Sequence, residues 1–146
     1  MWIQNIGAAD CVNGNHFDCG GNSMLIQISD PFSKDERLYV TPWFPTPKHQ
    51  FKEIHKFQFL DTEDDDKLSP EFGITDEQAN DIVNLLKHAL DNRMNVVVHC
   101  FAGVCRSGAV AEVGVMMGFI DTEAFRLPNT RVKTKMMRAL GWTYDA

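Results

Sequence analysis

The stretch that most constrains the fold is a short apolar run, a glycine-containing turn and a second run of small apolar residues. Residues 96–98, all valine, predict a short buried strand. Residues 109–117 predict a buried helix. When a tight loop joins a strand to the start of a helix, the backbone N–H groups of the loop point inward at the helix N-terminus. There they favour binding of a tetrahedral anion. The pattern therefore predicts an anion-binding loop between the strand and the helix.

Polar residues in this loop predict chemistry at the bound anion. Cys100 enters the loop, and a helix N-terminus with neighbouring cations favours the nucleophilic thiolate form of a cysteine. Arg106 leaves the loop and offers a planar guanidinium that suits two phosphate oxygens. Gly103 allows close backbone approach to the anion, and the Ser107 hydroxyl can donate to the cysteine sulfur. We expect a catalytic cysteine here; the alternative is a buried structural cysteine.

The pattern His-Cys-x-x-Gly-x-x-Arg-Ser, which begins at His99, resembles the signature of the cysteine-dependent protein tyrosine and dual-specificity phosphatases. The chain resembles the compact dual-specificity type seen in bacteria and phages; the resemblance extends over roughly residues 54–120, and the N-terminal third matches only in its general pattern of strands and loops. The resemblance implies that His99 orients and tunes the thiolate, and that no metal or other cofactor is needed. It also implies a phosphate-binding loop formed by Phe101, Ala102, Gly103, Val104, Cys105 and Arg106.

Cleavage of a phosphate ester needs a proton for the leaving oxygen. In the dual-specificity phosphatases the acid is an aspartate that follows a strand, a few tens of residues before the cysteine. Asp61 fits that place because the alternating residues 54–60 predict a strand. The separation from the cysteine is somewhat long for the family, so three neighbours in the same acidic run remain alternatives: Asp64, Asp65 and Asp66.

A second cysteine in the loop is a departure from the dual-specificity pattern. Cys105 directly precedes the arginine, and the two-cysteine loop resembles that of the low-molecular-weight tyrosine phosphatases, where the pair can form a reversible disulfide. The position of the loop along the chain remains dual-specificity-like. We hypothesise that Cys105 is a redox partner that protects Cys100 from irreversible oxidation. The alternative is a small side chain that fills space.

The remaining chain predicts strands that alternate with helices. Strands are expected at residues 2–6 and 24–28, and the turn formers of residues 10–22 predict a loop. A capping box, Thr75 to Gln78, starts an amphipathic helix, and residues 130–140 predict a last helix. We therefore expect an α/β fold, with a central mostly parallel sheet flanked by helices as in dual-specificity phosphatases. A single phosphatase domain is expected over residues 1–146.

The first half of the chain leaves two interpretations open. Cys11, His16 and Cys19 match no standard zinc spacing, so we interpret them as ordinary loop residues rather than metal ligands. Trp43 and Phe44 lie in a proline-rich segment that cannot be helical. These two aromatic residues either pack beneath the loop or line a substrate cleft.

Composition narrows the expected partners and compartment. The net charge of −6 argues against nucleic-acid binding, and no apolar run approaches the length of a membrane helix. The chain begins without a secretory signal. Two of the four cysteines lie in the predicted active loop, so a reducing compartment is favoured. We expect a cytoplasmic protein, monomeric, without membrane or nucleic-acid partners.

These observations predict a protein tyrosine or dual-specificity phosphatase that acts through a phosphocysteine intermediate, with an aspartate as general acid and base. The expected substrate is a phosphorylated protein or peptide, with phosphotyrosine favoured. Three alternatives remain. They are another Cys-x5-Arg enzyme such as an arsenate reductase or sulfurtransferase, a phosphatase of an RNA 5′ end, lipid or sugar, and a non-catalytic phosphotyrosine-binding module.

Overall fold

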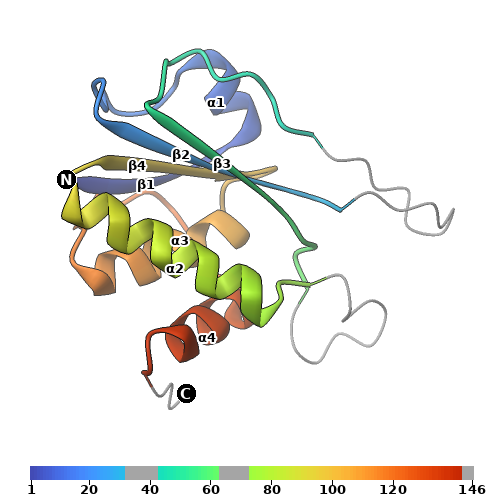
Figure 1. Cartoon of the computed structure of the whole chain (residues 1–146). Helices are drawn as coiled ribbons and strands as arrows, with labels where there is room; N and C mark the ends of the chain where they lie inside the picture. Colours follow the sequence, from blue (N-terminus) through green and yellow to red (C-terminus); the bar gives the residue numbers. More distant parts are fainter. Residues whose placement is uncertain (32–42, 63–72, 143–146) are drawn as a thin grey trace, which may run out of the picture.

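The computed structural model describes residues 1–31, 43–62 and 73–142 (Figure 1). At its centre is a five-stranded sheet in the order β3-β2-β4-β1-β5, in which every neighbouring pair is parallel. The strands are β1 (Trp2–Gly7), β2 (Ser23–Ser29), β3 (Glu53–Gln58), β4 (Asn95–Cys100) and β5 (Ile120–Asp121). The expected α/β architecture is confirmed. Because the strands are parallel, their carboxyl ends meet at one edge of the sheet.

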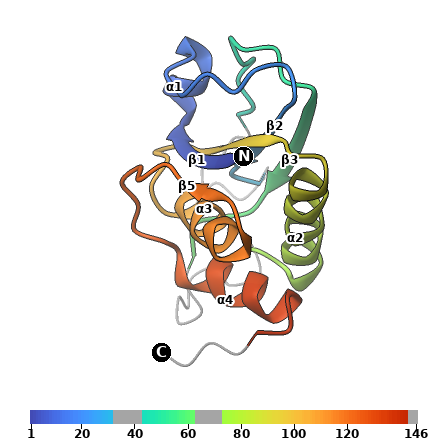
Figure 2. The ribbon, with the colours of Figure 1, turned by 90° about the vertical axis from the view of Figure 1, so that its left-hand side faces the viewer.

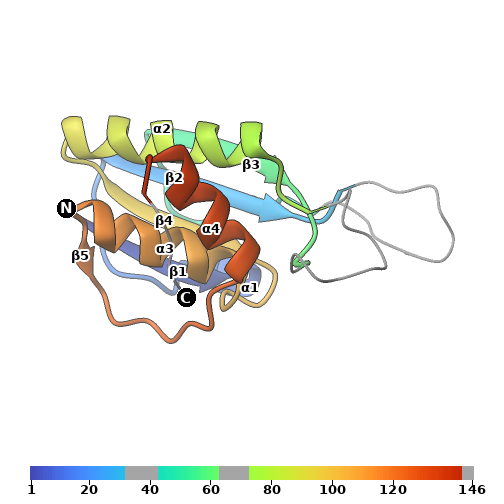
Figure 3. The same cartoon turned by 90° about the horizontal axis from the view of Figure 1, so that it is seen from below.

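Helices cover both faces of the sheet (Figures 1 and 2). One face carries α1 (Ala8–Asn13), and the other carries α2 (Asp76–Asp91), α3 (Arg106–Met117) and α4 (Thr130–Ala139). Seen from below, α4 lies across the space between α2 and α3 (Figure 3), and it contacts both. Within the described residues, no helix has both the length and the apolar character that crossing a membrane requires.

The larger hydrophobic core lies between the sheet and helices α2 to α4. Helix α2 begins as predicted: the Thr75 hydroxyl accepts the backbone N–H of Gln78 at 3.1 Å, and Gln78 Oε1 accepts the backbone N–H of Thr75 at 3.0 Å. Full burial of one leucine or isoleucine stabilises a fold by about 1.5–3 kcal/mol, so this helix face anchors α2 to the sheet. Its fully buried residues are Ala79, Ile82, Val83, Leu86 and Ala89.

The prediction of a loop over residues 10–22 is wrong for the first of these residues, because α1 occupies Ala8–Asn13. A six-residue helix is too short to show a helical period in its hydrophobic residues, and its Asp and Asn residues also occur in loops. Gly14, at φ 70°, ends it in the left-handed conformation that glycine adopts readily. Strand β5 has only two residues and was not predicted, and β3 ends at Gln58 rather than at residue 60.

Candidate active site

The predicted phosphate-binding loop joins β4 to α3 at the carboxyl edge of the sheet. Cys100 is the last residue of β4, and Arg106 is the first of α3. Gly103, between them, has φ +80°, and a β-carbon at this position would overlap the backbone of Ile6 and Gly7. Glycine is therefore required both by the backbone conformation and by the close approach of the loop to the end of β1.

The Cys100 side chain is only 3% exposed, and polar groups face its sulfur. Sγ accepts the backbone N–H of Gly103 at 3.2 Å and lies 3.2 Å from the Ser107 hydroxyl. The contact between Cys100 and Ser107 that the sequence predicts is thus present. Two donors face the atom that carries negative charge whenever the cysteine is a thiolate.

Arg106 is buried at the start of α3 and held by the ends of two other strands. Its Nη1 donates to Asp30 Oδ1 and to the carbonyl oxygen of Phe59, both at 2.8 Å. Asp30 follows β2 and Phe59 follows β3. Nε and Nη2 are further donors in the planar arrangement that suits an anion, and no described residue accepts a hydrogen bond from either. The ion pair with Asp30 also gives Arg106 a structural reason to be buried.

Asp61 lies on the surface just past the end of β3. Its Oδ1 accepts a hydrogen bond from Asn129 Nδ2 at 2.6 Å, and the backbone N–H of Asn129 donates to the carbonyl oxygen of Cys105 at 3.0 Å. Asn129 thereby connects the predicted acid to the phosphate-binding loop. The three alternative acids, Asp64, Asp65 and Asp66, lie outside the described residues.

His99 is fully buried one residue before the cysteine. Its Nδ1 lies 3.4 Å from the Cys100 carbonyl oxygen, and its Nε2 has no hydrogen-bond partner among the described residues. Burial lowers the pKa of His99, and the positive charge of Arg106 adds to this effect, while the hydrogen bond to the Cys100 backbone opposes it. The imidazole is therefore neutral near pH 7, which fits an orienting role.

Three buried or half-buried polar residues that support the loop were not identified from the sequence: Asn5, Asp30 and Asn129. Asn5 Nδ2, inside β1, donates to the carbonyl oxygens of Gly103 at 2.8 Å and Phe125 at 3.0 Å. An asparagine two positions after Ile3, on the face of the strand that alternation predicts to be buried, is a signal that could have drawn attention to it. Nothing in the local sequence indicates which loop residue each of the three contacts.

Trp43 and Phe44, the two aromatic residues of the proline-rich segment, have different surroundings. Trp43 is 47% exposed and Phe101, in the loop itself, is 72% exposed; their ring centroids are 6.3 Å apart. The backbone N–H of Trp43 donates to the Ser29 hydroxyl at 2.6 Å, which holds this segment against the end of β2. Phe44 instead packs under Lys56, whose Nζ lies 5.6 Å from the ring centroid.

Cys11 and Cys19 lie on the opposite face of the sheet from the loop cysteine. Both are buried in a cluster with Ile6, Leu25, Phe51 and Val97. Burial raises the pKa of Cys11 to about 11 and is also the main cause of the raised pKa of Cys19. Both are therefore protonated thiols near pH 7. In the described part of the chain, no three histidine, cysteine or acidic side chains are grouped as a metal site would require.

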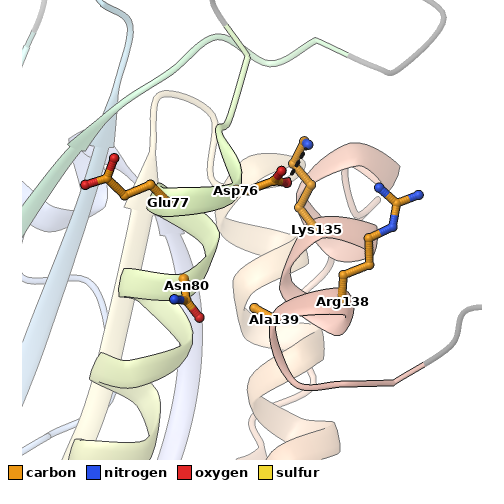
Figure 4. A pocket seen from close by; sticks show the side chains of 6 residues that line it. All are labelled: Asp76, Glu77, Asn80, Lys135, Arg138 and Ala139. Carbon is orange, nitrogen blue, oxygen red and sulfur yellow. Dashed lines mark hydrogen bonds and ion pairs between the residues drawn. The ribbon is translucent and has the colours of Figure 1, made fainter.

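A separate pocket of about 490 Å³ lies between α2 and α4 (Figure 4). Lys135 Nζ lies 2.8 Å from Asp76 Oδ1, and this hydrogen bond holds the pKa of Asp76 below its usual value. Acidic and basic side chains both line the pocket, so its charge does not select one kind of ion. None of the predicted site residues is among those that line it: Asp76, Glu77, Asn80, Lys135, Arg138 and Ala139.

A protein-family model matches residues 65–117, a little over a third of the chain, and is described as "Tc-R-P: Polymorphic toxin system, DSP-PTPase phosphatase". The matched range contains α2, β4, the phosphate-binding loop and α3. Over this range the chain is similar to a dual-specificity-phosphatase-like family. This family supports a phosphatase function, and the resemblance seen in the sequence is confirmed. No curated protein matches the chain.

Proposed function

We propose that this dual-specificity-phosphatase-like chain is a cysteine-dependent phosphomonoester hydrolase that acts on phosphotyrosine in proteins or peptides. The observation that carries the proposal is the environment of Cys100. Its sulfur faces the Gly103 N–H and the Ser107 hydroxyl, in a loop that ends at the buried guanidinium of Arg106. A nucleophile, backbone donors and a fixed cation at one strand end are the groups that phosphoryl transfer requires.

In the first step, the Cys100 thiolate attacks phosphorus in line with the leaving oxygen. The S–P bond forms as the P–O bond breaks, while loop N–H groups and Arg106 hold the equatorial oxygens. Asp61 gives its proton to the leaving phenolate oxygen. In the second step, the ionised Asp61 takes a proton from a water molecule that attacks phosphorus. The S–P bond breaks and the thiolate is released, stabilised by the Ser107 hydroxyl.

The exposed aromatic pair beside the loop supports phosphotyrosine as the substrate. Phe101, which follows Cys100, and Trp43, whose ring centroid lies 6.3 Å from that of Phe101, present exposed apolar ring surface. Aromatic pairs contribute about 0.5–1.5 kcal/mol beyond burial of their area. Phe125 and Leu127 add further exposed apolar surface, and Leu127 is tied to the loop through the Val104 carbonyl oxygen at 3.2 Å. An aliphatic phosphoserine side chain would leave these rings uncovered.

The proposal also covers the compartment and the oligomeric state of the protein. A catalytic thiol must stay reduced, which favours the cytoplasm, and we propose that the chain acts there as a monomer. The net charge of −6 disfavours an RNA end or an anionic lipid as the substrate. No cofactor enters the proposed steps.

The test is hydrolysis of p-nitrophenyl phosphate by the reduced full-length chain in the presence of a chelator. We expect turnover that vanadate inhibits and that Cys100→Ser abolishes. No turnover by the reduced wild type would contradict the proposal and favour a binding module. Assays of arsenate reduction and sulfur transfer on the same preparation test the other Cys-x5-Arg chemistries.

Substrate preference is tested with matched phosphotyrosine and phosphothreonine peptides. We expect Trp43→Ala and Phe101→Ala to lower kcat/KM for the phosphotyrosine peptide about 10-fold, as loss of about 1.4 kcal/mol of contact predicts. The phosphothreonine peptide serves as the control. Equal losses on both peptides would contradict recognition of the aromatic ring.

A further inference from the structure

We propose that Asn129 is a positioning residue for proton transfer: it holds the Asp61 carboxyl beside the phosphate-binding loop and directs the acidic proton to Oδ2. The inference rests on the proposed function, in which Asp61 is the general acid. It begins from the 2.6 Å hydrogen bond between Asn129 Nδ2 and Asp61 Oδ1. Among the described residues, no other side chain donates to this carboxyl group.

The orientation of the Asn129 amide is fixed by its surroundings. The residue is 1% exposed and is the N-cap of α4, where its Oδ1 accepts the backbone N–H of Val132 at 2.9 Å. The amide nitrogen must therefore face the other way. Its two protons point to Asp61 Oδ1 and to the carbonyl oxygen of Thr62, the latter at 3.1 Å.

This orientation decides which oxygen of the acid carries the proton. An amide nitrogen is a donor only, so the oxygen that it contacts must accept. When Asp61 is protonated, Oδ1 is thus the carbonyl-like oxygen, and the proton resides on Oδ2. The hydrogen bond selects one proton position in a carboxyl group that otherwise has two equivalent positions.

The same residue is also attached to the loop that holds the nucleophile. The backbone N–H of Asn129 donates to the Cys105 carbonyl oxygen at 3.0 Å. Cys105 directly precedes Arg106, and Arg106 in turn bonds the carbonyl oxygen of Phe59, two residues before Asp61. Acid, cation and loop therefore belong to one connected set of hydrogen bonds. Asp61 itself is exposed.

Helix capping is the structural role that Asn129 also has, and two substitutions separate it from positioning. Asn129→Ser and Asn129→Asp both keep an oxygen that can accept the Val132 N–H, and both remove the amide donor. Thr75→Ala is the matched control. It removes the corresponding cap of α2, which accepts from Gln78, and it leaves the hydrogen bonds of Asp61 untouched.

The experiment compares kcat/KM on phenyl phosphate, whose leaving group needs a proton, with kcat/KM on p-nitrophenyl phosphate, whose leaving group needs it much less. The value of kcat/KM reports the first step, in which the leaving group departs, and not the later hydrolysis that both substrates share. We expect both Asn129 variants to lower kcat/KM on phenyl phosphate about 10- to 100-fold, the range of a misplaced general acid, with a clearly smaller loss on p-nitrophenyl phosphate. Asn129→Ser combined with Asp61→Asn should be no slower than Asp61→Asn alone.

Equal losses on the two substrates, or additive losses in the double variant, would overturn the inference. So would a Thr75→Ala variant that shifts the ratio of the two rates as strongly. If Asp61→Asn leaves the ratio unchanged while Cys100→Ser is inactive, the positioning role fails and the phosphatase stands. If the wild type hydrolyses neither ester, the proposed function itself fails.

Discussion

Two buried cysteines on opposite faces of the same sheet have nearly equal exposure and very different neighbours. Cys100 is 3% exposed, and Cys11 is 1% exposed. The sulfur of Cys100 faces a backbone N–H and a hydroxyl, each at 3.2 Å. Cys11 lies among apolar side chains, and burial raises its pKa to about 11.

The difference shows that burial alone does not make a cysteine inert or reactive. Both thiols have lost contact with water, but only one has gained donors that can replace it. Those donors come from a loop turned by Gly103 and from the first turn of α3. The face that carries α1 lacks such a loop at Cys11, because that cysteine lies within a helix.

The largest expected effect comes from replacing each cysteine by serine. Cys100→Ser should abolish p-nitrophenyl phosphate turnover, a loss on the order of 10⁴-fold or more, because an alcohol is a far weaker nucleophile. Cys11→Ser should keep kcat but lower the free energy of unfolding by about 1–3 kcal/mol, because it buries a hydroxyl among apolar groups. Steady-state kinetics and urea unfolding measure the two effects. Turnover retained in Cys100→Ser would contradict the predicted difference between a catalytic Cys100 and a structural Cys11.

Alkylation should separate the two thiols next most strongly. At pH 7, a thiol with a pKa of about 11 is a thiolate in only about one molecule in 10⁴, so native Cys11 should stay unmodified by iodoacetamide. Cys100 should be modified first, with loss of activity that vanadate slows. Peptide mass spectrometry after timed quenching gives the order of modification. Modification of Cys11 before Cys100 in the folded protein would contradict the prediction.

The pH dependence of stability should show a smaller effect from His99. Because burial lowers its pKa, the unfolded chain takes up a proton before the folded protein does as the pH falls. The free energy of unfolding should therefore not be lowered by His99 above about pH 6.5. Below that pH it should decrease, by at most about 1.4 kcal/mol per pH unit. Urea unfolding at about pH 7.0, 6.0 and 5.5 measures how the free energy of unfolding changes with pH. These values lie around the usual pKa of histidine, about 6.5.

His99→Gln is the control for this slope, because it removes the titrating group. The slope between about pH 6.5 and 5.5 should become shallower in this variant. Glu53, whose pKa is lowered by hydrogen bonds from His55 and His88, contributes in a lower pH range near that of ordinary carboxylates. An unchanged slope in His99→Gln would show that another group causes the dependence.

The smallest expected effect concerns Cys105. If Cys105 is a redox partner, peroxide should convert the Cys100 thiolate to a sulfenic acid, and the Cys105 thiol should then attack that sulfur, forming the disulfide and releasing water. A thiol reductant reverses the disulfide. Activity recovered by dithiothreitol after peroxide should be several-fold higher in the wild type than in Cys105→Ser, because over-oxidation is irreversible. Equal recovery would leave Cys105 as a space-filling side chain.

Local features were the most predictable part of this molecule. The Thr75 capping box, strand β4 and helix α3 depend on neighbours within a few positions, and all are found where the sequence predicts them. The contact between Cys100 and Ser107 also follows from the loop alone. The prediction failed for α1 and β5, which are too short for a hydrophobic period to appear.

The sequence by itself determined the loop and the places of its cysteine and arginine, because a strand, a glycine turn and a helix start are fixed by local backbone preferences. Only the tertiary structure decided what holds them. Asn5 contacts Gly103, Asp30 contacts Arg106 and Asn129 contacts Asp61, across 98, 76 and 68 residues of sequence respectively. Such contacts exist because parallel strands bring distant segments to one edge, and no local pattern encodes which segments will meet there.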